Sequence, residues 1–295
     1  KGGKMLDFRV YTFLELCKTL NYTKTAENLF ITQPAVTQHI KYLEEFYNCK
    51  LFNYSNRVLT LTEQGNYLFK YFLTMNSDEI KIKEDVLEID SAEKNLHFGA
   101  TLTIGEYIIP DMLLKLGKLY PNINVKVIIK DTKELLKELQ NGNIEFALVE
   151  GFFEKTEYES IIYSKESFIG VCSPKNNLAK KNIGFEDLLN ERIIIREEGS
   201  GSRDIFEKIL YDNNLSLKNF DKKYELANIK AIKELVKEDR GITFIYERAV
   251  KKELENKELV KIGLKSFKAK REFNFIFMKN SIHRDEYKKW FEILK

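Results

Sequence analysis

The chain of 295 residues is long enough for two or three domains, each with its own hydrophobic core. Hydrophobic residues at 43% and charged residues at 32% are typical of a folded globular protein and exclude a disordered or fibrous one. The 48 Lys and Arg almost cancel the 45 Asp and Glu, so the net charge of +3 gives no indication of a nucleic-acid partner. No apolar run reaches the ~18 residues that a transmembrane helix needs, and we expect no membrane partner.

The N-terminus and the cysteines indicate the compartment. We interpret Lys1-Gly-Gly-Lys4 as an addition ahead of a native start at Met5, after which no secretory signal follows. The cysteines Cys17, Cys49 and Cys172 form no C-x-x-C pair, which favours a reduced, cytoplasmic protein. The 3 histidines are far apart in the sequence, so we expect neither a metal site nor a cofactor.

The first predicted elements are three helices. Apolar residues at helical spacing predict an amphipathic helix over residues 7–20. Thr23 is expected to cap a short helix over Lys24–Leu29, and Thr32 to cap a third helix that runs to about Phe46. Two short helices in succession, the second with a sharp start signal, are typical of a helix-turn-helix.

The third helix has two different faces. Val36, Ile40 and Leu43 follow i, i+4, i+7 spacing and are expected to pack inward. The opposite face carries amide, hydroxyl and ammonium groups, which are the groups that read base edges and bind phosphates. These residues are Gln33, Thr37, Gln38 and Lys41.

A hairpin is predicted next, over Leu51–Thr62, with Ser55-Asn56 at its tip and Arg57 beside it. Such a hairpin after a helix-turn-helix is a wing. Within residues 5–63 the 6 basic and 6 acidic side chains cancel. We therefore expect weak non-specific DNA binding, and specific binding that depends on polar contacts and on a second subunit.

Two segments of the N-terminal region resemble a known family. Residues 24–44, KTAENLFITQPAVTQHIKYLE, and the later Leu61-Thr-Glu-Gln-Gly65 resemble the winged helix-turn-helix of LysR-type transcriptional regulators. The resemblance implies groove-facing positions at Gln33, Pro34, Ala35, Thr37 and Gln38, and phosphate contacts from Thr32, Lys41 and Arg57. The family often has Arg where this chain has Tyr54, which leaves the usual wing contact in question.

A long helix is predicted over Glu63–Ile89. It carries a heptad pattern that Glu79 interrupts: Leu68, Phe72, Met75, Glu79, Ile82, Val86 and Ile89. We interpret residues 64–90 as a linker and dimerisation helix, as the family resemblance also implies; the alternative is a helix packed on its own domain. A two-fold dimer predicts double-stranded DNA with inverted half-sites.

From residue 95 onward, strand-like and helix-like segments alternate, which predicts an α/β domain with largely parallel sheets. The predicted strands are Leu96–Ala100, Asn124–Lys130, Glu145–Val149, Ser167–Cys172, Arg192–Arg196, Ile242–Tyr246 and Phe273–Met278. The predicted helices are Tyr107–Tyr120, Thr132–Asn141, Ser202–Asn213, Ile229–Glu238 and Arg284–Leu294.

Two strand-to-helix junctions are rich in hydroxyl and glycine residues, Thr101–Gly105 and Glu197–Arg203. Free N–H groups at helix starts suit an anion, and α/β folds bind ligands at the carboxyl ends of strands. Glu150, at the end of another predicted strand, is an alternative acceptor for a ligand ammonium and would favour an amino-acid-like effector.

The resemblance implies an effector domain over residues 95–295, similar to a type 2 periplasmic binding protein. Its two lobes would comprise about 95–163 with 266–295, and about 164–265. A loop at Gly199–Arg203 resembles that of subgroups near the cysteine-synthesis and carbon-fixation regulators. By this analogy the effector-binding residues are Thr101, Thr103, Gly151, Ser200 and Ser202.

No catalytic signature is present. Neither G-x-S-x-G, a glycine-rich phosphate loop nor H-E-x-x-H occurs, so we expect no enzyme. We predict a sequence-specific transcriptional regulator, a homodimer or homotetramer, whose DNA binding responds to a small anionic metabolite such as sulfate, phosphate, a carboxylate or an amino-acid-like compound. RNA polymerase is a further expected partner. The alternative is a solute receptor whose N-terminal domain mediates protein contacts only.

Overall fold

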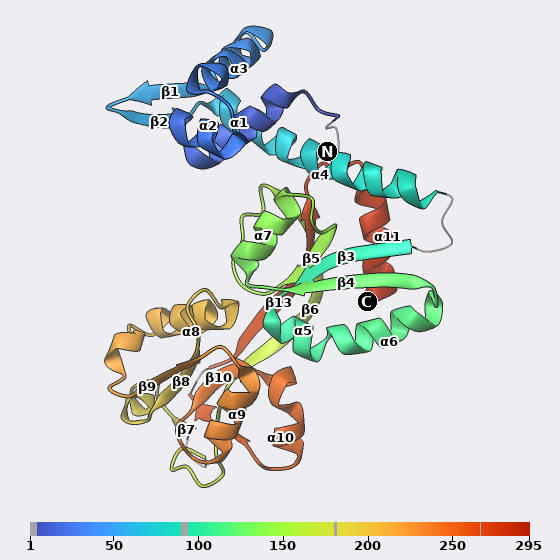
Figure 1. Ribbon diagram of the computed structural model, residues 1–295. Coiled ribbons are helices and arrows are strands. Elements are labelled where there is room, and N and C mark those ends of the chain that lie inside the picture. The colour runs from blue at the N-terminus through green and yellow to red at the C-terminus, as the bar shows by residue number, and fades with distance from the viewer. Residues whose placement is uncertain (1–4, 90–93, 180–181, 266) are drawn as a thin grey trace.

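The computed structural model describes residues 5–89, 94–179, 182–265 and 267–295. The interpretation of Lys1–Lys4 therefore lies outside the described residues. A small helical domain with a hairpin comes first, a long helix follows, and a two-lobed α/β region forms the rest of the chain (Figure 1). Among the described residues, no helix is both long enough and apolar enough to cross a membrane.

The N-terminal domain has the predicted order of elements: α1 (Phe8–Thr19), α2 (Tyr22–Leu29), α3 (Gln33–Phe46), β1 (Phe52–Ser55) and β2 (Val58–Leu61). The Thr32 cap is confirmed, since its side chain accepts a hydrogen bond from the Ala35 N–H. The Thr23 cap is wrong. Asn21 accepts from the Lys24 N–H instead, because asparagine is one of the strongest N-cap residues and starts α2 two residues earlier than predicted.

The core of this domain holds α3 in place. Val36, Ile40 and Leu43 are buried as predicted, in one cluster with Phe13 and Leu16 of α1. The hairpin turns at Asn56-Arg57, which adopt left-handed φ angles of 52° and 63°. The tip is thus one residue later than predicted, and two consecutive positive φ angles give the tight turn whose twist matches a two-stranded hairpin.

The long helix, α4, spans Glu63–Glu88, which confirms the linker helix. The heptad pattern does not form one exposed face. Phe72 and Glu79 are buried within the chain, whereas Met75 and Val86 are exposed. Glu79 is buried because it accepts hydrogen bonds from the Met5 N–H and the Tyr11 hydroxyl of the N-terminal domain. Part of the heptad pattern, Phe72 and Glu79, therefore packs α4 against its own chain.

The α/β region is built on a seven-stranded sheet in the order β10-β6-β13-β5-β3-β4, with β11 also paired to β6. Its strands are β3 (Lys94–Ala100), β4 (Ile123–Ile129), β5 (Phe146–Val149), β6 (Tyr158–Cys172), β10 (Thr243–Tyr246), β11 (Val260–Lys261) and β13 (Ala269–Met278). Strand β3 pairs in parallel with β4 and β5, whereas β6 and β13 pair antiparallel with their neighbours. The sheet is mixed, and the expectation of largely parallel sheets is wrong for it.

The two long strands β6 and β13 pair antiparallel and run between the lobes (Figure 1). Their polar halves, 158–166 and 269–272, were not predicted as strands, since polar side chains obscure the apolar signal there. Two small parallel pairs complete the second lobe. They are β7 (Asn182–Ile183) with β12 (Gly263–Leu264), and β8 (Ile193–Arg196) with β9 (Lys223–Leu226).

The helices of this region largely follow the prediction: α5 (Leu102–Tyr107), α6 (Ile109–Leu119), α7 (Thr132–Gln140), α8 (Gly201–Asp212), α9 (Ile229–Lys237), α10 (Lys251–Glu255) and α11 (Arg284–Leu294). Short 3-10 turns occupy Glu186–Asn190, Leu217–Asn219 and Glu247–Val250. The helix predicted over Tyr107–Tyr120 corresponds to α6, with Pro110 in its first turn, where a missing N–H is tolerated. The short helix α5 that precedes it is not among the predicted helices.

Aromatic packing fixes the sheet. Phe146 stacks between Phe98 and Phe275, with ring centroids 5.0 and 4.4 Å away. In the second lobe Phe206 stacks on Phe244 at 4.4 Å. These residues belong to one buried cluster that extends through both lobes, so the strand ends that face the space between the lobes are held on a rigid frame.

Candidate nucleic-acid interface and ligand cleft

The exposed face of α3 brings the predicted groove residues together. Gln33, Pro34, Thr37 and Gln38 are exposed, and Ala35 is half-buried beside them. The Gln33 side-chain amide donates to the Thr37 hydroxyl at 3.0 Å, and that hydroxyl also lies 3.2 Å from the Gln33 carbonyl oxygen. Amide and hydroxyl groups of this kind are among those that read base edges in the major groove.

The predicted phosphate contacts come from two elements. Thr32 and Lys41 lie exposed at the start and in the third turn of α3, whereas Arg57 lies exposed at the tip of the wing. Tyr54, on β1 of the same hairpin, is 73% exposed. Its side chain is therefore free to donate a hydrogen bond, but it supplies no charge.

The charges of this domain are partly neutralised within it. Lys50 pairs with Glu44 at 2.7 Å, and Lys41 lies 3.7 Å from Glu45. Since these cations have acidic neighbours, the surface near α3 carries a weak electrostatic field. Sequence-independent attraction to phosphates is correspondingly small.

A small cavity of about 180 Å³ lies where several strands of both lobes end. Its lining consists of Thr101, Leu102, Ile129, Lys130, Asp131, Glu150, Arg196, Glu197, Ser200, Gly201 and Ala227. Two predicted effector residues, Thr101 and Ser200, are among them. Both stand at helix N-caps, of α5 and α8, yet neither side chain makes a capping hydrogen bond.

Thr103 and Ser202 meet at a buried acid, Glu150. The Thr103 hydroxyl donates to Glu150 Oε1 at 3.0 Å, and Ser202 Oγ lies 3.4 Å from the same oxygen. Burial raises the pKa of Glu150 to about 7, although these hydrogen bonds and the Arg196 charge oppose the shift. The Tyr246 hydroxyl approaches this carboxyl, but among the described residues neither it nor Glu150 Oε2 has a partner at ordinary hydrogen-bond geometry.

Gly151 lies against Gly201, which lines the cavity of about 180 Å³, but does not itself line that cavity. It lines a second cavity of about 320 Å³ with Phe153, Lys270 and Asn274 of the hinge region. Its φ of 93° is left-handed, and a Cβ there would stand 3.3 Å from Gly201 Cα. Glycine at this position therefore allows the two lobes to approach closely.

Sequence reasoning missed Lys130, Asp131, Arg196 and Ala227 as lining residues. Each ends a strand or lies within two residues after one, at β4, β8 or β9. The rule that ligands bind at the carboxyl ends of strands would have indicated them, had it been applied to every strand rather than to the two glycine- and hydroxyl-rich junctions.

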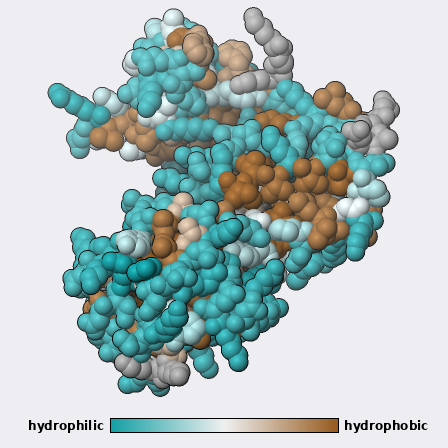
Figure 2. All heavy atoms as spheres, turned by 60° about the horizontal axis from the view of Figure 1, so that its bottom comes forward, coloured by the Kyte–Doolittle hydropathy of each residue, from teal (hydrophilic) through white to brown (hydrophobic). Residues whose placement is uncertain are grey.

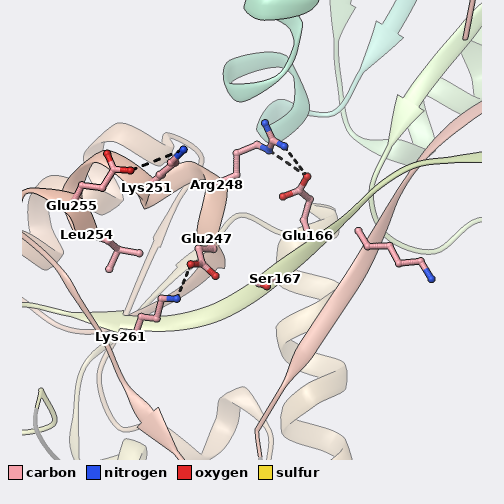
Figure 3. Close-up of a pocket in the computed structure, with 9 residues that line it drawn as sticks. Glu166, Ser167, Glu247, Arg248, Lys251, Leu254, Glu255 and Lys261 are labelled. Carbon is pink, nitrogen blue, oxygen red and sulfur yellow. Dashed lines mark hydrogen bonds and ion pairs between the residues drawn. The ribbon is translucent and has the colours of Figure 1, made fainter. Parts of the chain in front are cut away.

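A wider groove of about 560 Å³ on the second lobe is a weaker candidate. Figure 3 shows its charged side chains paired with each other: Arg248 with Glu166, Lys261 with Glu247, and Lys251 with Glu255. The groove is open and its cations already have acidic partners. The groove therefore offers a ligand few charged groups that are not already paired within the protein.

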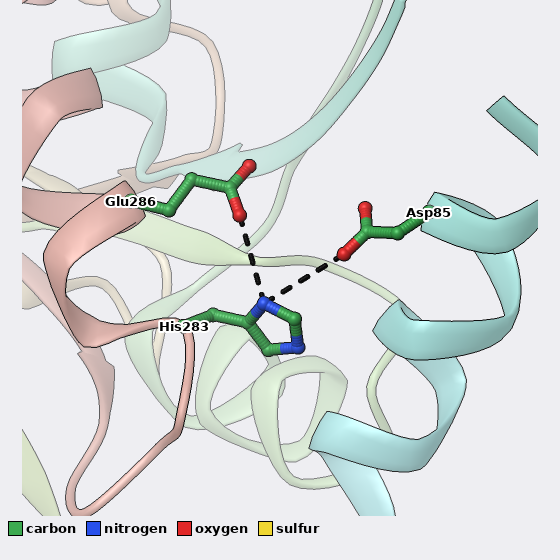
Figure 4. Close-up of side chains that lie close together, drawn as sticks. All are labelled: Asp85, His283 and Glu286. Carbon is green, nitrogen blue, oxygen red and sulfur yellow. Dashed lines mark ion pairs between the residues drawn. The ribbon is translucent and has the colours of Figure 1, made fainter. Parts of the chain in front are cut away.

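A third cluster joins α4 to the first lobe. His283 Nδ1 lies 3.7 Å from Asp85 and 3.6 Å from Glu286, and the three groups face each other in Figure 4. They could offer three ligand atoms to a metal ion. Lys81, however, lies 2.8 Å from Asp85 and 3.5 Å from Glu286, so an ammonium already pairs with both carboxylates, and we assign no metal here.

Comparisons with known proteins agree with this architecture. The family described as "Bacterial regulatory helix-turn-helix protein, lysR family" matches residues 9–66, and "LysR substrate binding domain" matches residues 90–295. The HTH-type transcriptional regulator CysL of Bacillus subtilis is 30% identical over 267 residues, covering 90% of this chain and 88% of CysL. A probable RuBisCO transcriptional regulator of Cyanidium caldarium is 29% identical, covering 87% and 82%.

Solved structures show the same fold at lower identity. A hydrogen-peroxide-bound OxyR mutant of Corynebacterium glutamicum gives a TM-score of 0.62 at 20% identity, over 100% of this chain and 92% of that one. Full-length BenM gives 0.58 at 18% identity, over 97% and 94%. With both family domains matched in order, this chain belongs to the LysR family of DNA-binding transcriptional regulators, which carry an effector-binding domain and are not enzymes.

Proposed function

We propose that this regulator recognises a specific operator through the exposed face of α3, and that a small metabolite in the cleft between the lobes modulates this binding. The observation that supports the first part is the set of exposed, mutually hydrogen-bonded Gln33 and Thr37 side chains beside Gln38. Pro34 and Ala35 allow close approach to the groove, while Thr32, Lys41 and Arg57 contact phosphates. A regulator of this kind acts on chromosomal DNA in the cytoplasm.

The protein acts as a homodimer or homotetramer on inverted half-sites. Tyr67, Tyr71 and Met75 follow i, i+4, i+8 spacing along α4 and are 62%, 40% and 45% exposed. This face, rather than the heptad pattern that includes buried Phe72, suits a partner's helix. Figure 2 shows a second apolar patch on the first lobe, where α6 and the edge strand β4 expose Leu114, Leu119 and Ile129.

The effector occupies the 180 Å³ cavity and carries an anionic group. Thr101 and Ser200 supply hydroxyls, and the first turn of α8 supplies free N–H groups and a partial positive charge. Thr103 and Ser202 position Glu150 from opposite lobes. Gly151 contributes by allowing the lobes to close.

Strand β5 connects this cleft to the linker helix. Glu150 directly follows β5 at the cleft, and Glu145 directly precedes it at the joint, where Lys81 of α4 lies 3.2 Å from the Glu145 carboxylate. A movement of the lobes therefore acts on the helix that presents the DNA-binding domain. The altered geometry of the oligomer changes operator binding and contact with RNA polymerase.

The test is a quantitative footprint on a selected operator. Gln33→Ala and Thr37→Ala each remove a base-reading group and are expected to lower operator affinity by roughly tenfold while non-specific binding stays unchanged. Gln64→Ala removes an exposed amide at the start of α4 and is the matched control. Equal footprints for all variants would contradict the assignment.

The same footprint tests the alternative, a solute receptor whose N-terminal domain binds only proteins. Such a receptor would protect no DNA sequence in preference to another, so protection of a specific operator would exclude it.

A further inference from the structure

The Glu150 carboxyl lacks a cationic partner among the described residues. Its residue is 2% exposed, at the carboxyl end of β5. Oε1 accepts from Thr103, and the Tyr246 hydroxyl approaches the carboxyl, but among the described residues the buried Oε2 has no partner at ordinary hydrogen-bond geometry and Glu150 takes part in no ion pair. An unsatisfied buried carboxylate oxygen is costly, so a ligand that supplies a donor at this position gains a strong interaction.

The cations around the same cavity are already engaged. Arg196 binds both carboxylate oxygens of Glu197 at 2.7 Å, and Lys130 binds Glu138 at 2.7 Å. Asp131 adds a further carboxylate to the lining. A purely anionic compound would therefore meet acidic groups whose charge the engaged cations do not offset.

The start of helix α8, in the other lobe, presents hydrogen-bond donors opposite Glu150. Ser200 makes no side-chain cap, so no capping side chain satisfies the first N–H groups of the twelve-residue helix α8. Gly201 lies directly against the acid, since a Cβ there would stand 3.1 Å from the Glu150 carbonyl oxygen. The buried Thr101 hydroxyl, also without a partner among the described residues, completes this side.

We propose that the effector is a small amino-acid-like zwitterion whose ammonium group pairs with Glu150 and whose anionic group binds at the first turn of α8. This inference rests on the proposed function of the cleft. The cavity of about 180 Å³ suits a small compound.

The experiment titrates the full-length chain calorimetrically with three matched sets of probes. The first set comprises the twenty standard amino acids, the second the corresponding 2-hydroxy acids, and the third the corresponding amines without a carboxylate. Serine, glycerate and ethanolamine are one such triplet. At least one small amino acid is expected to bind and raise the melting temperature, and its hydroxy acid and amine are each expected to bind at least tenfold more weakly.

Glu150→Gln keeps an acceptor for Thr103 but removes the charge. It is expected to abolish most of the preference for the amino acid over the hydroxy acid, whereas the exposed Glu198→Gln control keeps it. Since Glu150 has a pKa of about 7, binding of the amino acid to the unmodified chain should also weaken from pH 8 to pH 6, and this dependence should disappear in Glu150→Gln.

Two results overturn the inference. One is a carboxylate, sulfate or phosphate without an amino group that binds as tightly as every amino acid; the other is the absence of binding by all twenty amino acids. Specific operator binding in the same preparation would leave the proposed function standing, and its loss would refute that function instead. If Glu150→Gln fails to fold, the relative affinities of the unmodified chain for the amino acids, hydroxy acids and amines still test the inference.

Discussion

The DNA-binding face and the effector cleft are built in opposite ways. On α3, one run of residues supplies an exposed surface in which Gln33 and Thr37 are neighbours in sequence and in space. In the cleft, Thr103 is 1% and Ser202 5% exposed, and the groups that meet come from segments far apart in the chain. An exposed polar surface costs little to maintain, whereas a buried acid such as Glu150 lowers the stability of the protein. Mutations should therefore have different effects in the two regions. Substitutions on α3 should weaken DNA binding, whereas substitutions in the cleft should change the stability of the protein.

The joint between the two regions should show one of the two largest effects. Although burial opposes its charge, Lys81 has a raised pKa because Glu145, Asp85 and Glu286 surround it. Lys81→Met leaves Glu145 buried without its cation and should lower the free energy of unfolding by about 3 kcal/mol at pH 7. Urea denaturation measures this change.

Lys70→Met, on the exposed side of the same helix, is the control and should change stability little. A loss of stability no larger than that of the control would show that the joint is solvated and does not hold α4 to the first lobe.

The cleft should respond to pH through Glu150. Its pKa is raised from 4.5 to about 7, so the protein loses stability as pH rises from about 4.5 to 7 and does not regain it above. Glu150→Gln does not titrate and should therefore be more stable than the unmodified chain by about 3 kcal/mol at pH 8, and equally stable near pH 4.5. Thermal unfolding at the two pH values tests this, and a difference that is the same at both would contradict it. Glu145 titrates in the same range but cancels in the comparison.

His283 should give a smaller effect of the opposite sign. Its hydrogen bond to Glu286, with further help from Asp78 and Asp85 and against burial, raises its pKa. The charged histidine stabilises the protein fully below the ordinary pKa of about 6.5, and this contribution is lost as pH rises through the raised value. His283→Gln should cost about 1 kcal/mol at pH 6 and almost nothing at pH 9, as measured by urea denaturation. A cost that grows with pH would refute this arrangement.

At the DNA-binding face, substitutions that change charge should alter the salt dependence of DNA binding. Tyr54→Arg adds a cation to the wing and should steepen the slope of log affinity against log salt by about 0.9 for each additional phosphate that the wing neutralises. Lys41→Ala should flatten the slope by a similar amount. Titrations on a random duplex measure both, with Tyr54→Phe as the uncharged control; an unchanged slope in Tyr54→Arg would place the wing away from the phosphates.

The sequence was most informative where the structure is local. The α3 helix, its Thr32 cap and its buried Val36, Ile40 and Leu43 follow from spacing within one segment. Long-range features were less accessible. The antiparallel pairing of β6 with β13 joins residues far apart in the chain, and nothing in either segment specifies it.

The same contrast applies to the cleft. Thr101 and Ser200 were predicted from their local motifs, and both line the cavity. Gly151 is expected in the same site but lines the neighbouring cavity, where it lies against Gly201. Arg196 and Lys130 escaped notice because a single cation after a strand resembles any surface charge until the neighbouring strands are known.

The central claim is that an electrically neutral DNA-binding domain reads its operator as a symmetric pair. Selection of binding sites from a random duplex library by the full-length chain tests it most directly. The account predicts a consensus of two inverted half-sites whose centres lie one or more helical turns apart, together with weak binding to unselected duplexes. Enrichment of a lone half-site, or of no sequence at all, would contradict it.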